Sequence, residues 1–253
     1  MMPIRCYLVC AVQRTGSGLL TETLKSTAVA GVPEEYFLSF EEGDWARKHG
    51  VPTRQAFLDL VFAKGTGPNG VFGAKLMWNT FQDPFQTKLR EMPVYAELSD
   101  VELLNTFFNQ PKFIWNTRRD KVRQAVSWAI AAQTDIWASH QSEPHQGEPE
   151  KLPVFDFEFI DNLHRLAIEW EASWADFFKR AGLQPFKVVY EDFLEDFAAT
   201  AVSLFDYLEI RLPAGFRLEK PTTIKQQATA RNNKWAARYI EMKYDRDSLR
   251  PEL

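Results

Sequence analysis

The spacing of apolar and polar positions alternates along the chain between two periods. Short apolar runs rich in β-branched and aromatic residues predict four strands, at 7–12, 71–79, 112–120 and 186–192, the last two running into charged turns. Longer segments have apolar residues at helical spacing. They are 19–24, 56–62, 81–109, 121–137, 156–181, 198–208 and the tail 222–244. Strands alternating with helices predict an α/β fold, a three-layer sandwich around a central, mostly parallel sheet.

The first strand is followed by a small polar turn that carries two glycines. The turn reads Gln13-Arg14-Thr15-Gly16-Ser17-Gly18-Leu19-Leu20, and the helical spacing starts at its end. Strand, tight loop and helix together point backbone N–H groups at one spot, which suits an anion such as a phosphate. The loop is not a Walker A motif, because Leu19 and Leu20 stand where that motif has its lysine and its metal-binding hydroxyl. By itself, the pattern is equally typical of a structural turn.

Composition narrows the functional classes. The 253 residues are 45% hydrophobic, enough for a large core, and no repeat or linker divides them, so we expect a single domain over 1–253. A net charge of −4 gives no indication of nucleic-acid binding. No apolar run approaches a membrane span, and two cysteines four residues apart in a strand predict buried thiols without a disulfide. We expect a cytoplasmic protein, and no metal site at His140 and His145.

Three further positions carry candidate chemistry, each with a plain structural alternative. Glu35, after a proline, is either a general base near the loop or an acid in the first turn of a helix. Lys75, near the end of the second strand, either contacts a ligand or extends its ammonium group to solvent. Arg118 after the third strand and Ser127 in the following helix either hold a second phosphate or cap a turn and face solvent.

Taken together and in this order, these segments resemble sulfotransferases that use 3′-phosphoadenosine-5′-phosphosulfate (PAPS), most closely the bacterial trehalose 2-sulfotransferase family. The resemblance runs from Tyr7 to Tyr239. The matching segments are 13–20, 35–37, 74–79, 118–127 with its continuation to Trp137, and 226–235. Two positions depart from the family pattern: Gly18 replaces a hydroxyl residue of the loop, and Gln226 replaces an arginine of the tail.

The resemblance implies a P-loop-like sulfotransferase fold, PAPS as co-substrate without a required metal, and a hydroxyl of a carbohydrate or glycolipid as acceptor. A homodimer is also implied. Glu35 would be the general base, with Arg14 at the 5′-phosphate leaving group and Lys75 at the leaving oxygen. The implied nucleotide-binding residues are Arg14, Thr15, Gly16, Ser17, Gly18, Leu19, Arg118, Ser127, Tyr190, Gln227 and Arg231. The implied acceptor-binding residues are Glu35, Tyr36, Trp78 and Asn79. The alternatives are a P-loop nucleotide kinase and a catalytically idle nucleotide-binding module.

Overall fold

A four-stranded parallel sheet forms the centre of the computed structural model, which describes residues 3–40, 44–137, 152–221 and 230–248. The strands are β1 (Arg5–Ala11), β2 (Val71–Met77), β3 (Lys112–Thr117) and β4 (Phe186–Val189), in the order β2-β1-β3-β4. Val9 of β1 pairs with Lys75 on one side and with Ile114 on the other. The strand that follows β1 in the chain, β2, therefore pairs with one edge of β1, and the next strand, β3, pairs with the opposite edge. The carboxyl ends of β1 and β3 flank this switch point, where open α/β sheets bind their ligands.

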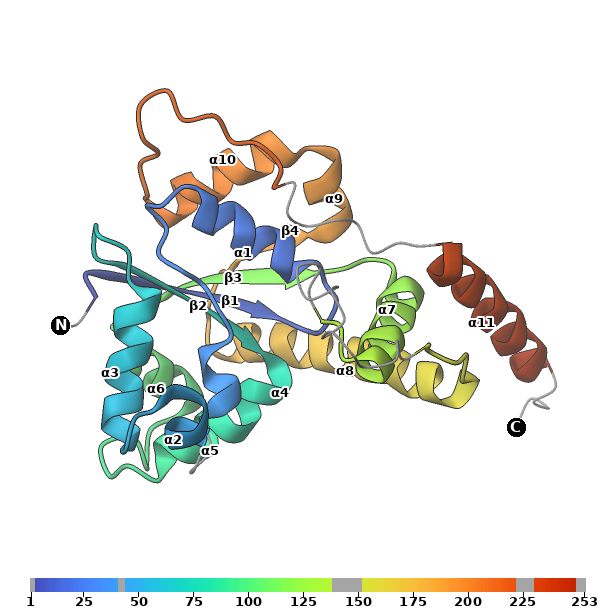
Figure 1. The fold of residues 1–253 in the computed structure, drawn as a ribbon, viewed down its shortest axis with the longest axis horizontal. Coiled ribbons are helices and arrows are strands. Elements are labelled where there is room, and N and C mark those ends of the chain that lie inside the picture. Colours follow the sequence, from blue (N-terminus) through green and yellow to red (C-terminus); the bar gives the residue numbers. More distant parts are fainter. Residues whose placement is uncertain (1–2, 41–43, 138–151, 222–229, 249–253) are drawn as a thin grey trace.

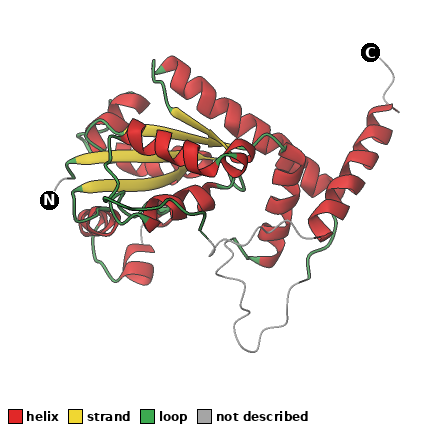
Figure 2. Ribbon diagram, turned by 90° about the horizontal axis from the view of Figure 1, so that it is seen from above, coloured by secondary structure: helices red, strands yellow, loops and turns green. Residues whose placement is uncertain are grey.

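Helices cover both faces of the sheet, which confirms the three-layer α/β fold. Side chains of β1 alternate between the faces, since Tyr7 and Val9 join one buried cluster and Leu8 and Cys10 the other. Figure 1 shows α1 (Ser17–Ser26), α9 (Tyr190–Glu195) and α10 (Phe197–Leu208) on one face, and α3 (Arg54–Gly65), α6 (Asp100–Phe107) and α8 (Phe157–Arg180) on the other. Figure 2 shows the same layers from above.

The remaining elements are short, apart from two helices at the end of the sheet that bears the strands' carboxyl termini. These two are α7 (Lys121–Thr134) and α11 (Ala230–Ser248). The short elements are η1 (Tyr36–Ser39), α2 (Asp44–His49), α4 (Trp78–Thr80), η2 (Phe81–Gln86) and α5 (Thr87–Arg90). In the parts of the chain that the structure describes, no helix is both long and apolar enough to pass through a lipid bilayer.

The helix starts follow from local sequence. The side chains of Asp120 and Asp156 accept hydrogen bonds from backbone N–H groups of Arg123 (2.8 Å) and Phe159 (3.0 Å), so each aspartate caps its helix. Ser99 and Glu102 form a reciprocal capping box at the start of α6. These caps fix where α6, α7 and α8 begin, and α7 and α8 carry polar side chains to the sheet's carboxyl edge.

Several boundaries differ from the sequence prediction. The segment 81–109 is not one helix: it divides into η2, α5 and α6, with a non-helical backbone at Asp83 before Pro84 and a turn between α5 and α6. The third and fourth strands end at Thr117 and Val189, where the charged turns begin, and α7 ends at Thr134 rather than at residue 137.

The second strand ends at Met77 rather than at residue 79, because Trp78 starts α4 and packs its ring against Trp174 and Phe81 at 5.0 and 5.7 Å. The last helix continues to Ser248. Trp235 and Tyr239, which helical spacing places on one face of this segment, are both buried. The expectation for His140 and His145 falls outside the described residues.

Candidate functional site

The loop between β1 and α1 has the backbone of an anion-binding turn. Arg14 and Gly16 have φ angles of 63° and 82°, in the left-handed region, and Gly16 is the N-cap of α1. Gly16 offers the helix no capping side chain, so the first amides of α1 are not satisfied by a cap. Left-handed turns that lead into a helix N-terminus bring amides together around negative charge. The strand, loop and helix predicted at 7–24 are confirmed.

Side chains hold this loop by its carbonyl groups, three of them from elsewhere in the fold and one, Thr15, from the loop itself. Four consecutive carbonyl oxygens, from Ala11 to Arg14, each accept a hydrogen bond from a side chain. The donor is Trp174 for the carbonyl of residue 11 (3.0 Å), Thr15 for residue 12 (2.9 Å), Gln124 for residue 13 (2.8 Å) and Arg118 for residue 14 (3.1 Å). Because the carbonyl and N–H of one peptide unit point in opposite directions, these contacts turn the loop's carbonyls toward the protein and leave its amides on the other side.

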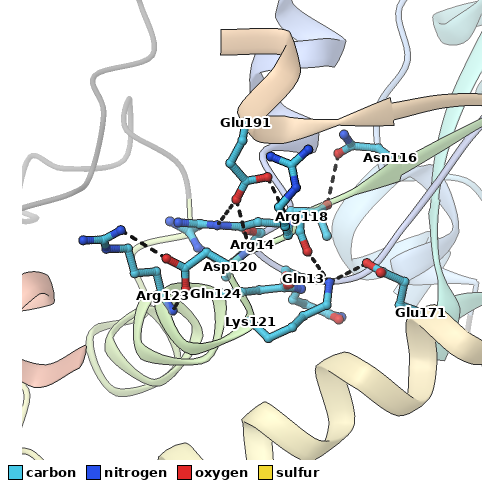
Figure 3. A network of polar contacts seen from close by, with 12 residues as sticks. Gln13, Arg14, Asn116, Arg118, Asp120, Lys121, Arg123, Gln124, Glu171 and Glu191 are labelled. Atoms are coloured by element: carbon cyan, nitrogen blue, oxygen red, sulfur yellow. Dashed lines mark hydrogen bonds and ion pairs between the residues drawn. The ribbon is translucent and has the colours of Figure 1, made fainter. Parts of the chain in front are cut away.

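Two arginines meet beside the loop, one from each side of the switch point (Figure 3). Arg14 donates from Nε to Ser127 Oγ at 2.9 Å, and it also donates to the carbonyl of Trp137. Burial and the nearby charge of Arg118 lower the pKa of Arg14 to about 10, and burial also lowers the pKa of Arg118. Two partly buried guanidinium groups, one of which lowers the pKa of the other, form a site in which an anion is favoured.

The first turn of α9 completes this side of the site. The guanidinium of Arg118 lies 5.0 Å from the ring centroid of Tyr190, and the same ring contacts Gly16. A Cβ atom at Gly16 would lie 2.1 Å from Tyr190 Cδ2, so only glycine fits there. Glu191 accepts hydrogen bonds from the backbone N–H groups of Arg119 (2.9 Å) and Asp120 (3.1 Å), which fixes the turn that carries Arg118. Burial raises the pKa of the Glu191 carboxyl, but these backbone N–H donors and the nearby charge of Arg118 together outweigh burial and lower the pKa.

Glu35 and Lys75 form an ion pair, Nζ to Oε1, at 2.8 Å, toward the carboxyl end of β2. The backbone holds both residues in place, because Lys75 N donates to Glu34 O at 2.9 Å. Glu34 in turn contacts Lys25 of α1 at 2.5 Å. Gln13 of the loop donates to Asn79, just after β2, at 2.7 Å, so the loop and the end of β2 are directly connected. A carboxylate and a cation therefore lie one strand away from the arginine pair.

For the other residues predicted to bind the nucleotide or the acceptor, the structure shows no hydrogen bond or ion pair with the arginine pair or with the Glu35–Lys75 pair among the contacts it describes. Trp78 is only 8% exposed, and Tyr36 donates its hydroxyl to Val32 O while its ring packs near Phe72. Arg231 is exposed at the start of α11, and Gln227 lies outside the described residues. The predicted roles of these residues stay predictions. Thr15, Ser17 and Leu19 are buried, and Leu19 belongs to the core cluster under α1.

No role was predicted from the sequence for the residues that support the loop. They are Gln13, Asn116, Lys121, Gln124, Glu171, Trp174 and Glu191. The one usable hint is Gln124, a polar residue on the inward face of a helix, where it is 0% exposed. Among the residues that the structure describes, no cluster of three or more His, Cys, Asp or Glu side chains has the arrangement of a metal site.

Comparison with known proteins assigns this architecture to a family. The profile of the Stf0 sulphotransferases matches residues 6–242. The chain is similar to the trehalose 2-sulfotransferase of Mycobacterium tuberculosis (strain ATCC 35801 / TMC 107 / Erdman), with 28% identity covering 93% of this chain and 94% of that protein. It is also similar to the trehalose 2-sulfotransferase of Mycolicibacterium smegmatis, with 27% identity covering 92% and 93%.

Among solved structures, the sulfotransferase domain of the Synechococcus PCC 7002 olefin synthase aligns with 94% of this chain and 95% of its own. The TM-score is 0.40 and the identity 14%, a level that supports no residue correspondence. The family assignment therefore depends on the sequence profile, which spans the loop, both arginines, the Glu35–Lys75 pair and most of α11. This chain belongs to the Stf0 sulphotransferase family.

Proposed function

We propose that the protein transfers a sulfuryl group from PAPS to a hydroxyl of a carbohydrate or glycolipid acceptor. The observation that carries this proposal is the pair of arginines, Arg14 and Arg118, at the switch point of the sheet beside an uncapped helix N-terminus. PAPS has phosphate groups at both its 5′ and 3′ positions, so its site needs two sets of cations and donors. The loop and α1 supply one set, and Arg118 with Ser127 the other.

The arrangement suggests which phosphate of the nucleotide each set of cations and donors binds. The amides of residues 14–18 would hold the 5′-phosphate, where charge develops as the bond to sulfur breaks, while the Leu19 amide donates to Gly16 O and closes the turn. Arg118 and Ser127 would hold the 3′-phosphate, which ATP lacks. The Arg14 side chain contacts Ser127 at 2.9 Å while its backbone belongs to the loop, so Arg14 is placed between the two sets. Tyr190 would stack beside the nucleotide from its position next to Gly16 and Arg118.

Glu35 is the proposed general base. Its carboxylate would accept the proton of the attacking hydroxyl while the oxygen of that hydroxyl forms its bond to sulfur. The 2.8 Å contact with Lys75 orients the carboxylate and places a cation beside it. Lys75 would then also offset the charge that develops on the leaving oxygen. Bound PAPS supplies the activated sulfuryl group, and the chain's own residues bind, orient and deprotonate.

The two curated relatives are trehalose 2-sulfotransferases, which makes a trehalose-like sugar the first acceptor to test. Tyr36, Trp78 and Asn79 are the proposed acceptor-binding residues. A cytoplasmic location and a homodimer are part of the same proposal, since both come from the resemblance to this family.

The two alternative functions, a P-loop nucleotide kinase and a catalytically idle nucleotide-binding module, are opposed by different observations. A P-loop kinase would need a lysine after Gly18, and that position is Leu19, which is 4% exposed in the core cluster; the family assignment also opposes it. A catalytically idle nucleotide-binding module is favoured only by Gly18, which removes one hydroxyl from the loop. The intact Glu35–Lys75 pair opposes that alternative.

Calorimetric titration tests the proposal. We expect adenosine 3′,5′-bisphosphate to bind without added metal and to bind more tightly than ATP with Mg²⁺. Glu35→Gln should bind this nucleotide like the wild-type protein but lose turnover. Tighter binding of ATP with Mg²⁺ would contradict the donor assignment, and retained turnover in the variant would contradict the choice of base.

A further inference from the structure

A chain of polar side chains connects α8 to the loop through the first turns of α7 (Figure 3). Lys121 Nζ lies 2.6 Å from Glu171 Oε2 of α8 and 3.3 Å from Gln124 Oε1. It also donates to the backbone carbonyl of Arg118. One ammonium group, which has three donors, therefore contacts three acceptors from different segments. Lys121 itself is largely buried, with 17% of its side chain exposed.

Gln124 continues the chain to the loop. Its side chain is fully buried, and its two ends have different partners: Oε1 faces Lys121, while Nε2 donates to Gln13 O at 2.8 Å. Because the ammonium group has only donors, it requires the oxygen end of the amide to face Lys121. The NH₂ end must then face Gln13. Lys121 thus fixes the orientation in which Gln124 can hold the loop.

The peptide between Gln13 and Arg14 is the target of this contact. Its carbonyl points to Gln124, so its N–H, which belongs to Arg14, points the opposite way. The same lysine holds the carbonyl of Arg118, the residue that donates to Arg14 O at 3.1 Å. Both arginine-bearing segments are therefore positioned from behind by a single residue that lies on the far side of the loop from its amides.

We propose that Lys121, acting through Gln124 and held by Glu171, is a positioning residue for the anion-binding loop and Arg118. Its removal frees the Gln124 amide to rotate and the peptide at Gln13 to turn its carbonyl toward the anion. The inference rests on the proposed function for the identity of that anion, the bisphosphate of the nucleotide. In this proposal, Lys121 affects the affinity for the sulfuryl-donor nucleotide without contacting that nucleotide.

A purely structural role is the competing explanation, since an ion pair between α7 and α8 also joins two helices. The same helices are joined by the ring contact between Trp128 and Trp170, with centroids 5.4 Å apart. Trp170→Phe is therefore a matched control, because it loosens the same helix pair without affecting any contact to a loop carbonyl. A structural role of Lys121 predicts the same pattern for both variants.

The test is calorimetric titration of the full-length protein with adenosine 3′,5′-bisphosphate, together with thermal unfolding. Lys121→Met should weaken the Kd about tenfold to a hundredfold, as expected for loss of hydrogen bonds to a charged group. Lys121→Arg, which keeps charge and donors, should recover part of that loss. Trp170→Phe should lower the Tm and leave the Kd within about twofold of wild type.

The contrary results are equally clear. A Lys121→Met protein that binds the nucleotide like wild type overturns the inference. If that variant does not fold, Glu171→Gln decides, because it removes the charge that holds Lys121; we expect a Kd weaker by about threefold to tenfold, and an unchanged value overturns the inference. If the wild-type protein itself does not bind the bisphosphate, the proposed function fails and the inference falls with it.

Discussion

The contact between Gly16 and Tyr190 gives the sharpest quantitative prediction. Alanine at position 16 would carry a Cβ atom in a left-handed conformation with φ near 82°, which costs about 1–2 kcal/mol for a residue with a side chain. That atom would also lie 2.1 Å from Tyr190 Cδ2 and 2.7 Å from Cε2, and relieving such an overlap by repacking costs about 1–3 kcal/mol. We therefore expect Gly16→Ala to lower the free energy of unfolding by about 2–5 kcal/mol.

A control separates the two contributions. Gly182, which follows α8, has a φ of 64°, and a Cβ atom there would meet nothing within 4 Å. Gly182→Ala should therefore cost only the backbone contribution, about 1–2 kcal/mol. In the Tyr190→Ala background the overlap at Gly16 is absent, so Gly16→Ala should cost about 1–3 kcal/mol less there than in the wild-type protein.

Urea unfolding followed by tryptophan fluorescence measures all four variants, because the chain has eight tryptophans. The nucleotide affinity of Gly16→Ala should fall as well, since the displaced loop carries the amides. Refutation would come from an equal cost of Gly16→Ala and Gly182→Ala, or from additivity of Gly16→Ala and Tyr190→Ala within about 0.5 kcal/mol.

Three other predictions use the same protein. Arg118→Ala should weaken binding of adenosine 3′,5′-bisphosphate about tenfold to a hundredfold by calorimetry, and a loss of less than twofold would remove Arg118 from the site. Lys75→Met should lower kcat more than it changes the nucleotide Kd, because it releases the carboxylate of Glu35; an unaltered kcat would argue against that pair. Burial raises the pKa of Cys6 to about 12 and raises that of Cys10 well above its ordinary value, so both thiols stay protonated in the folded state and iodoacetamide at pH 8 should label them only after unfolding. Since the folded state holds these protons more tightly than the unfolded chain, stability should fall as pH rises past the ordinary thiol value of 9.0, and rapid labelling of the native protein would contradict the buried placement.

The period of the apolar pattern was enough to predict the layers of the fold. The strands of the sheet are four to seven residues long and mostly apolar, and parallel strands buried on both faces give nearly continuous apolar runs of this kind. The strand boundary at Met77 could not be predicted, because Trp78 has a good strand propensity and its packing against Trp174, almost a hundred residues away in sequence, draws it into α4.

Part of the candidate site, like part of the fold, could be predicted from local sequence, and part could not. Arg14, Lys75 and Arg118 follow strand ends or lie near them in sequence, so the convergence of parallel strands was enough to place them on one edge. Glu35 follows no strand, and its place beside Lys75 depends on the isolated pairing of Glu34 with Ala74 of β2. The contacts that orient them come from α7, α8 and α9, through Gln124, Trp174 and Tyr190. Contacts over more than a hundred residues depend on how the helices pack on the sheet, which local spacing does not record.

Sulfuryl transfer itself is the most direct test of the account. The wild-type protein should be incubated with PAPS carrying radiolabelled sulfate and with a panel of sugars and glycolipids that includes trehalose, without added metal, beside Glu35→Gln and a Lys112→Met control. Lys112 pairs with Glu209 at 2.9 Å at the amino end of β3, away from the site, so its loss should leave turnover unchanged. The account predicts label on at least one hydroxylated acceptor with the wild-type and Lys112→Met proteins and none with Glu35→Gln. Equal labelling by Glu35→Gln, or no transfer and no binding of the bisphosphate nucleotide by the wild-type protein, would contradict it.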